Sequence, residues 1–527
     1  MLSRKWITKW EPNDGTFWES QGKGIARRNL IFSIFAEFLG FSVWNMWTTV
    51  TVALALPIVP FAFKTGESAT LIASQMLLLT AIPNLVGATL RLPYGAAVSI
   101  FGGRNWTVIS AALLLIPTVM LAVAISDIHT SFQTLCIVAG LAGVGGGNFA
   151  SSMANISHFY PDKKKGSALG LNAAGGNIGV AVVQFIVPAA IGAGVLGLVL
   201  GAGKAAGKAD AIKHHIKAAA QPKYIANYLT THGIHLNLAN AGLVWIPFIV
   251  VATICAFFFM DNLAVSRASL KEQASILKRP HTWLMSVLYI GTFGSFLGYA
   301  ASFGLLITAL YDPTGVTALK IGFLGPLVGS LARPFGGWLS DRIGGTIVTF
   351  GNFVCMAAAT LGLVMILRLH DPNTFGLFVA TFLFLFVTTG IGNGSTYRMI
   401  PPLYLGDRLR AAAGRGTQAL AKADLDGRRE AAAALAFVSA IGAYGGFLIP
   451  FVFSTSFNPI GVTFKTPALQ LTYQLHAAEV AFGLFMGFYV LCTVITGVFY
   501  LRTGHEALPA KVQLKSDQPS MVSVEVA

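Results

Sequence analysis

The chain has 527 residues, of which 54% are hydrophobic and only 11% are charged, and its mean hydropathy is +0.67. Soluble domains carry about a quarter charged residues, so the composition excludes a soluble protein and predicts an all-α integral membrane protein. The net charge of +15 does not indicate nucleic-acid binding, because the Lys and Arg residues flank apolar segments instead of forming one basic patch.

Twelve apolar segments are long enough to cross a bilayer as helices, which takes roughly 20 residues each. Several contain Gly and Pro and exceed the minimum length, so we expect tilted or kinked helices. The predicted segments are 29–61, 68–101, 105–125, 132–158, 166–200, 239–260, 282–311, 318–340, 347–367, 374–400, 431–456 and 476–502.

Lys and Arg are concentrated on alternate connections between these segments, which places both termini in the cytoplasm by the positive-inside rule. We divide the chain into a cytoplasmic N-terminal segment 1–28, a six-helix half 29–260 with an external loop 201–238, a central cytoplasmic loop 261–281, a second six-helix half 282–502 with a cytoplasmic insert 405–430, and a cytoplasmic tail 503–527.

The hydrophilic connections suggest little chemistry of their own. The sequence SRASLKEQASILKRP in the central loop predicts a short surface helix. The polar composition of the tail predicts disorder. His214 and His215 in the external loop offer nitrogen ligands, but a solvated loop is the favoured interpretation. The four cysteines lie in apolar stretches without metal-binding spacing, so we expect no metal and no cofactor.

Two arginines lie deep inside apolar segments, in similar settings. Arg91 stands in Leu-Arg-Leu-Pro-Tyr-Gly and Arg333 in Ala-Arg-Pro-Phe-Gly-Gly. A guanidinium stays charged at any biological pH, and burying one within the bilayer is costly. Snorkelling or backbone hydrogen bonds would explain a single buried arginine. Two at matching positions, with few acidic residues at depth, favour a buried anion site.

The two halves repeat further features after each arginine. A Gly-Gly pair follows, and then a segment with Gly and Asn: Gly145 to Ser152 in the first half and Gly390 to Tyr397 in the second. Such a six-plus-six duplication places a substrate site between the halves, near the midplane of the bilayer. Buried asparagines need hydrogen-bond partners, so Asn148, Asn172, Asn177 and Asn393 are candidates for a polar cavity or for contacts between helices.

Aromatic side chains near these segments could form the wall of the site. Tyr289 and Phe293 are four residues apart and share one face of a helix, and Phe149 follows Asn148 directly. A planar anion fits between aromatic faces when cations meet its edge. Ordinary packing is the competing explanation for each ring.

Glu37 is a carboxylate inside the first apolar segment. A buried carboxyl group suits a proton carrier, and a hydrogen bond between helices or a position near the membrane surface explains it equally well. Arg398 and Glu479 lie near the ends of their segments and are predicted to be interfacial. No nucleophile–base pair or phosphate-binding loop of catalytic quality is present, so we expect no enzyme.

Two longer motifs resemble those of a known family. Gly336 to Gly345, reading GGWLSDRIGG, is similar to the loop motif of the major facilitator superfamily. The stretches from Gly146 to Pro161 and from Gly392 to Pro401 resemble the two signatures of its nitrate/nitrite porter family, and the similarity runs from about Trp10 to Arg502. These motifs are long and specific.

The resemblance implies a major facilitator fold of twelve transmembrane helices in two pseudo-symmetric halves, and transport of nitrate, nitrite or both across the plasma membrane. It implies that Arg91 and Arg333 clamp the anion, with Phe149, Tyr289, Phe293 and Asn177 around it. Asp341 and Arg342 would latch helices on the cytoplasmic side, although the first-half equivalent, Gly95 to Gly103, lacks the Asp. The resemblance also implies signature or gating roles for nine further residues: Asn148, Asn172, Gly175, Gly176, Asn393, Gly394, Ser395, Gly442 and Gly445.

The coupling mode is left open between two alternatives. The family includes proton symporters and nitrate/nitrite exchangers, and the exchangers resemble this chain less at Glu37 and in the second signature. Proton-coupled nitrate symport, with Glu37 as the candidate proton site, is therefore favoured over exchange. An anion channel and a non-transporting membrane sensor are more distant alternatives. We expect the lipid bilayer, nitrate, nitrite and protons as partners, and a functional monomer.

Overall fold

The computed structural model describes residues 6–56, 59, 61–193, 237–264, 275–313, 315–460, 464 and 466–502. Most of the predicted external loop, the middle of the central loop and the tail from 503 lie outside the described residues, as do His214 and His215. Within the described part, twelve helices are long and apolar enough to cross a membrane, which confirms the predicted number of spans.

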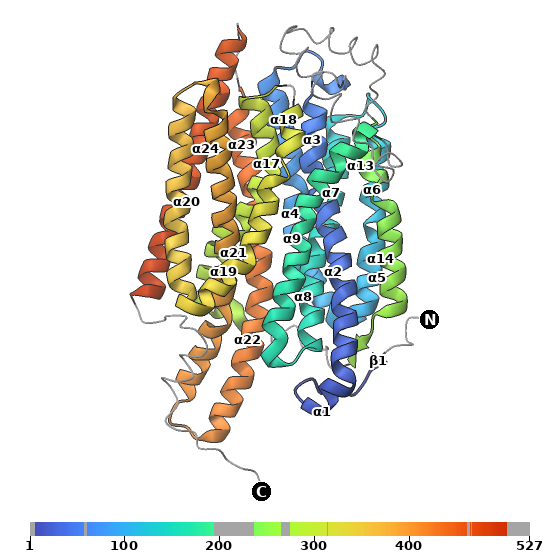
Figure 1. Cartoon of the computed structure of the whole chain (residues 1–527), viewed down its shortest axis with the longest axis vertical. Coiled ribbons are helices and arrows are strands. Elements are labelled where there is room, and N and C mark those ends of the chain that lie inside the picture. The colour runs from blue at the N-terminus through green and yellow to red at the C-terminus, as the bar shows by residue number, and fades with distance from the viewer. Residues whose placement is uncertain are drawn as a thin grey trace.

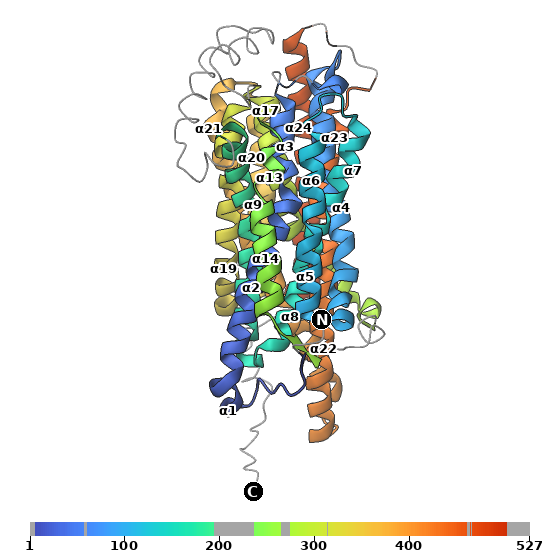
Figure 2. The same ribbon diagram turned by 90° about the vertical axis from the view of Figure 1, so that its right-hand side faces the viewer.

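The twelve spans form one upright bundle in which the two six-helix halves stand side by side (Figures 1 and 2). The first half contains α1 (Gly15–Phe17), α2 (Lys23–Asn45), α3 (Trp47–Ala55), α4 (Ala69–Phe101), α5 (Gly103–Leu113), α6 (Leu115–Ala124), α7 (Phe132–Ala142), α8 (Val144–Phe159), α9 (Asp162–Ala193), α13 (Asn240–Leu243) and α14 (Ile246–Phe259). The second contains α16 (Pro280–Tyr289), α17 (Ser295–Leu310), α18 (Val316–Ile321), α19 (Leu324–Ile343), α20 (Gly345–Arg368), α21 (Phe375–Ala412), α22 (Thr417–Ala443), α23 (Gly445–Phe457) and α24 (Pro467–Thr496).

Short helical turns complete the bundle. The π-helical turns are η1 (Trp18–Gly22), η5 (Ile290–Gly294) and η7 (Gly497–Leu501), and the 3₁₀ turns are η2 (Ala62–Lys64), η4 (Ser275–Lys278) and η6 (Pro372–Thr374). We call the end of the bundle that carries α1 the terminal face, and the end that carries α18 the opposite face (Figure 1). The turn η5 interrupts the first span of the second half, as π-helical turns often do at functional sites.

The terminal face differs from the sequence prediction at two places. Helical structure already begins at Gly15, where Asp14 caps the helix by accepting hydrogen bonds from the backbone N–H groups of Thr16 and Phe17. The predicted insert 405–430 is mostly a continuation of α21 and α22, which project beyond the bundle as a hairpin (Figure 1). Its Ala-rich sequence favours helix, so the composition already contained this signal.

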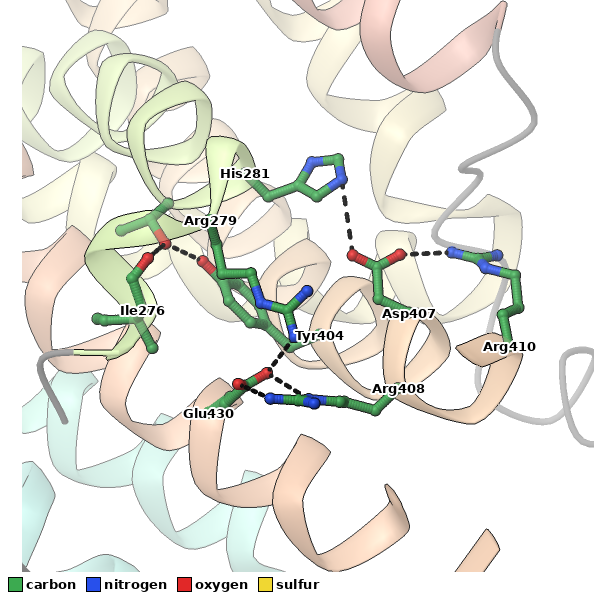
Figure 3. Close-up of polar contacts among 9 residues, drawn as sticks. Ile276, Arg279, His281, Tyr404, Asp407, Arg408, Arg410 and Glu430 are labelled. Atoms are coloured by element: carbon green, nitrogen blue, oxygen red, sulfur yellow. Dashed lines mark hydrogen bonds and ion pairs between the residues drawn. The ribbon is translucent and has the colours of Figure 1, made fainter. Parts of the chain in front are cut away.

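An ion-pair network holds this hairpin to the start of α16 (Figure 3). Glu430 of α22 pairs with Arg408 of α21 and with Arg279, whose side-chain nitrogen lies 3.0 Å away. Asp407 lies 3.0 Å from Arg410 and 3.8 Å from His281. Because the Glu430 side chain is only 9% exposed, its charge depends on these partners more than an exposed pair would.

A two-residue parallel strand pair closes the terminal face of the first half. Strand β1 (Trp6–Ile7) pairs with β2 (Asn262–Leu263), which follows α14. Trp10, Trp18 and Leu263 are buried together with Ile156 and Phe159 of α8. The polar N-terminal segment is therefore packed onto its own half.

In each half, glycines allow neighbouring helices to pack closely together. In the first half, Gly40 of α2 packs against Gly145 of α8, and in the second half, Gly329 of α19 packs against Gly390 of α21. A Cβ atom at Gly145 or at Gly390 would overlap the carbonyl oxygen of its partner. Packing thus explains these glycines, as it commonly does between membrane helices.

The two halves are joined at the opposite face by a reciprocal serine pair. The Ser74 hydroxyl of α4 donates to the Ser454 carbonyl oxygen of α23 at 2.8 Å, and the Ser454 hydroxyl donates to the Ser74 carbonyl oxygen at 2.8 Å. Nearby, Gln184 of α9 donates to the carbonyl oxygen of Ala300 on α17 at 2.9 Å. Separation of the halves at this face must break all three hydrogen bonds.

Replacing both Ser74 and Ser454 with alanine is expected to favour opening at this face. Each hydrogen bond contributes about 0.6–1.5 kcal/mol, so losing two shifts the open-to-closed ratio about tenfold. The labelling rate of a Thr49→Cys probe measures the shift in a background without native cysteines, because Thr49 lines a small cavity at this seam.

The control for this pair is Thr455→Ala. Among the described residues, the Thr455 hydroxyl bonds only within its own helix, to the carbonyl oxygens of Phe451 and Val452. Equal labelling rates in the control and in the double-serine variant would contradict a joining role for the pair.

Candidate anion-binding site

Arg91 lies on α4 at the interface between the halves and is 1% exposed. Its Nε donates to the carbonyl oxygen of Gly146 in the first half at 3.2 Å, and its Nη1 donates to the carbonyl oxygen of Ser439 in the second half at 2.9 Å. Among the described residues, its Nη2 has no hydrogen-bond partner. A buried charged donor without an acceptor is costly, and a bound anion would supply the acceptor.

Arg333 occupies the corresponding position on α19. Its Nη2 lies 3.5 Å from the Tyr289 hydroxyl, a long contact, and its Nη1 has no partner among the described residues. Neither Arg91 nor Arg333 forms an ion pair with a carboxylate in the described part of the chain. The two guanidinium groups lie within electrostatic range of each other, so their charges repel, and the attraction of a bound anion would offset that repulsion.

Four aromatic rings form a layer that connects the two arginines. Phe149 of α8 stacks on Phe293 of η5 at 6.1 Å between centroids, and Phe293 stacks on Tyr289 at 5.3 Å. Tyr289 in turn contacts Tyr397 of α21 at 5.8 Å. The guanidinium carbon of Arg91 lies 4.5 Å from the Phe149 centroid and 4.9 Å from that of Phe293, and cation–π attraction at this range holds the charge in place.

Several amides beside this layer keep unused hydrogen-bonding atoms. The Tyr289 hydroxyl donates to Asn393 Oδ1 at 2.7 Å. Within the described residues, Asn393 Nδ2, Asn177 Oδ1, both side-chain polar atoms of Asn148, and Thr396 Oγ1 lack partners. Buried polar atoms are normally satisfied by protein or by ordered ligands and water, so these atoms are candidates for contact with a polar ligand. No described hydrogen bond joins Asn177 or Asn148 to either arginine.

Glu37 belongs to a separate polar cluster on α2. Its side chain is fully buried, and its Oε2 accepts a hydrogen bond from Asn172 Nδ2 of α9 at 2.6 Å. Its Oε1 has no partner among the described residues. The absent side chain of Gly176 makes room for this carboxylate, as that of Gly175 does for Ile34.

The structure therefore realises one of the interpretations left open for Glu37, a hydrogen bond between helices. The carboxylate also interacts electrostatically with Arg91 and Arg333. A role for Glu37 as a proton site stays a prediction.

Small residues of the second signature and of the eleventh span allow close helix contacts beside the site. They are Gly394, Ser395, Gly442 and Gly445. A Cβ at Gly394 would overlap the Arg333 carbonyl oxygen, and one at Gly442 would overlap the Tyr289 ring. Gly445 packs against Gly294 of η5. The Ser395 hydroxyl lies 2.8 Å from that of Thr349 on α20. These residues fix the helices that carry Arg333 and Tyr289.

In the loop motif of the second half, Asp341 joins α19 to α21 by pairing with Arg398 at 2.6 Å, whereas Arg342 packs on the Trp338 ring of its own helix at 4.1 Å. In the first half, where the Asp is missing, Asn262 accepts a hydrogen bond from the Arg104 backbone N–H at 2.9 Å. The turn between α4 and α5 is thus held by Asn262, which follows α14 at the end of the sixth span.

Sequence reasoning missed three contributors to the site. Tyr397 could have been found, since it follows Asn393 by four residues and so shares its helix face. Trp44, whose ring centroid lies 5.3 Å from the Arg91 guanidinium carbon, gave no such signal. The Ser439 carbonyl is a backbone group, which carries no mark in the sequence.

Twelve membrane-spanning helices in two six-helix halves, with two buried arginines at their interface, are the architecture of a membrane transport protein. Residues 30–450 match the Major Facilitator Superfamily. The chain is 39% identical over 503 residues to nitrate/nitrite transporter NarU of Escherichia coli (strain K12), covering 95% of this chain and 97% of the relative. It is 32% identical to the probable nitrate/nitrite antiporter NarK2 of Thermus thermophilus, covering 95% and 98%.

Among solved structures, the crystal structure of a D-xylose-proton symporter aligns with a TM-score of 0.58 at 15% identity, covering 89% of this chain and 98% of the other. That likeness concerns the fold alone. The chain belongs to the nitrate/nitrite porter family of the major facilitator superfamily.

Proposed function

We propose that this protein is a secondary active transporter of nitrate and nitrite that works by alternating access. The observation that carries this proposal is the pair of free guanidinium nitrogens, Arg91 Nη2 and Arg333 Nη1, at the two ends of one aromatic layer. Nitrate and nitrite are planar monovalent anions, which fit against stacked rings while cations meet their edges. The two relatives named above, a nitrate/nitrite transporter and a probable nitrate/nitrite antiporter, agree with this chemistry.

The site residues receive the following roles. Arg91 and Arg333 clamp the anion, while Phe149, Tyr289 and Phe293 form the wall against which it lies. Asn177 and Asn148, which keep polar side-chain atoms without partners among the described residues, are assigned to the same site. Asp341 and Arg342 stabilise the terminal face. We place this face on the cytoplasmic side of the plasma (inner) membrane, and we propose that the protein acts as a monomer.

Proton-coupled nitrate symport is the favoured coupling mode. Glu37 is a fully buried carboxylate within electrostatic range of both arginines, so its protonation state and the occupancy of the anion site influence each other. Bound nitrate reduces the positive field and favours the protonated form of Glu37, whereas its departure favours proton release. This linkage is what symport requires.

Nitrate/nitrite exchange is the second candidate. It is favoured by the name of one relative with 32% identity, a probable antiporter. In an exchanger, the two unpaired guanidinium groups would keep the empty carrier from reorienting, because their charge is balanced only when an anion is bound.

Labelled nitrate uptake into proteoliposomes distinguishes the two modes. In symport, an inward proton gradient accelerates uptake without internal nitrite, and a pH-sensitive dye reports acidification of the lumen. Uptake that requires internal nitrite and ignores the gradient would select exchange. Absence of saturable transport of either anion would reject both candidates.

Replacing Glu37 with Gln is expected to abolish proton-driven accumulation while labelled nitrate–nitrate counterflow continues, because counterflow needs no net proton movement. The matched control is Glu479→Gln, since Glu479 pairs with Arg368 at 3.2 Å in α24, away from Glu37. Proton-driven accumulation that survives in the Glu37 variant would place the proton site elsewhere.

A further inference from the structure

A column of polar side chains runs from Glu37 toward the terminal face along α2. Asn29, Ser33 and Glu37 follow one another at four-residue spacing, so they share one face of the helix. Each is at most 1% exposed. Polar groups in a membrane span are costly unless they are paired, so this column needs an explanation beyond packing.

A hydrogen-bond network connects the column to two neighbouring helices. The Ser33 hydroxyl lies 2.8 Å from the Ser152 hydroxyl of α8. Asn172 Nδ2 of α9 lies 2.6 Å from Ser152 Oγ and 2.6 Å from Glu37 Oε2. Asn172 Nδ2 therefore holds the Glu37 carboxyl group and the Ser152 hydroxyl beside each other. Glu37, Ser152 and Ser33 thus lie in sequence, with the Asn172 amide between the first two.

The column continues to the surface of the terminal face. Asn29 Nδ2 donates to Asp261 Oδ2 at 3.0 Å, and Asn29 Oδ1 accepts from the Asp261 backbone N–H at 2.9 Å. Asp261 also pairs with Arg28, whose side chain is 43% exposed. Ser33 therefore lies one helical turn, about 5.4 Å, from the buried Asn29, which is linked to the partly exposed Arg28 side chain through Asp261.

We propose that Ser152 and Ser33 relay the proton of Glu37 to the terminal face, a step that rests on the proton-coupled mode of the proposed function. A hydroxyl group can accept one proton while it donates another, which an amide cannot do. The proton leaves Glu37 for Ser152 Oγ, Ser152 passes its own hydroxyl proton to Ser33 Oγ, and Ser33 passes its proton to water that enters when the carrier opens at the terminal face. Both serines end neutral, and Glu37 ends as a carboxylate.

The charges around Glu37 give this relay a direction. The charged groups that face it are Arg91 and Arg333, and Tyr397 is a titratable neighbour. When nitrate has left, the arginines stabilise the carboxylate of Glu37. The anion site itself is a poor exit for a cation, because both guanidinium groups are positive. The serine column leads away from them along α2.

The relay is tested in the full-length protein with Ser152→Ala and Ser33→Ala. Ser151→Ala is the matched control, because in the described part of the chain the buried Ser151 hydroxyl bonds only the Asn148 carbonyl of its own helix, at 3.1 Å. Proteoliposomes are assayed for nitrate uptake driven by an inward proton gradient, with a pH dye inside, and for nitrate–nitrate counterflow without a gradient.

Each alanine variant of the relay is expected to slow proton-driven uptake about tenfold and to leave counterflow within about twofold of wild type. Ser151→Ala leaves both rates unchanged, and Ser152→Thr, which restores a hydroxyl, recovers the proton-driven rate. Retained counterflow shows that each variant is folded.

Two outcomes overturn the relay alone: proton-driven uptake in Ser152→Ala equal to that in Ser151→Ala, or equal loss of uptake and counterflow. The arm with Glu37→Gln separates these from failure of the proposed coupling. If wild type shows no proton coupling, or Glu37→Gln retains it, the coupling assignment falls together with the relay. If Glu37→Gln loses coupling and the serine variants keep it, only the relay is wrong.

Discussion

Replacing Arg91 with lysine is expected to lower saturable nitrate transport about a hundredfold. Lysine keeps the charge but lacks the planar guanidinium fork. The fork of Arg91 binds the carbonyl oxygens of Gly146 in one half and Ser439 in the other, and its Nη2 keeps no partner among the described residues. It also cannot stack its charge over Phe149 and Phe293 as a flat group. Both proton-driven uptake and counterflow decline, because anion binding is common to both.

The control for Arg91 is Arg398→Lys. Arg398 pairs with Asp341, and both side chains are about half exposed; an exposed pair contributes only about 0–1 kcal/mol. We expect transport within about twofold of wild type in this control. Unchanged affinity and rate in Arg91→Lys would reject the clamp, whatever the coupling mode.

Replacing Gly390 with alanine is expected to prevent stable assembly of the second half. A Cβ there would overlap the Gly329 carbonyl oxygen and the Ala332 side chain, and neither backbone can yield without separating α19 from α21. Overpacking of this kind costs typically about 1–3 kcal/mol and sometimes more. The yield of monodisperse protein and its thermal unfolding in detergent measure the effect.

Gly376→Ala on the same helix is the matched control, since nothing lies within 4 Å of a Cβ at that position. Alanine favours helix by about 0.5–1 kcal/mol over glycine, so this variant is expected to match or exceed the stability of wild type. Equal stability of the two variants would show that the close contact between α19 and α21 is not required.

Much of the architecture was predictable because membrane spans are encoded in composition. Twelve apolar segments gave twelve helices, and the two arginines stood out because a buried charge is costly. The grouping of Tyr289 and Phe293 followed from their four-residue spacing. Helix ends were less predictable: α21 and α22 extend past the apolar residues because Ala-rich polar sequence continues a helix readily.

The partners of the arginines were not predictable in the same way. Arg91 binds two backbone carbonyls, and a carbonyl is identical at every residue. Which one it meets depends on how α4 crosses α8 and α22, which is set by packing of the whole bundle. The same holds for Glu37 and Asn172, whose contact depends on how closely Gly176 lets α2 approach α9.

The strand pair between Trp6–Ile7 and Asn262–Leu263 also has a consequence for biosynthesis. Chains are made from the N-terminus, so β1 emerges long before its partner and stays unpaired while six spans are inserted. Its pairing is a contact of very high sequence separation, which forms late in folding. The pair therefore closes the first half only after its sixth helix is in place, so that the half can be completed as a unit while the second half is still on the ribosome.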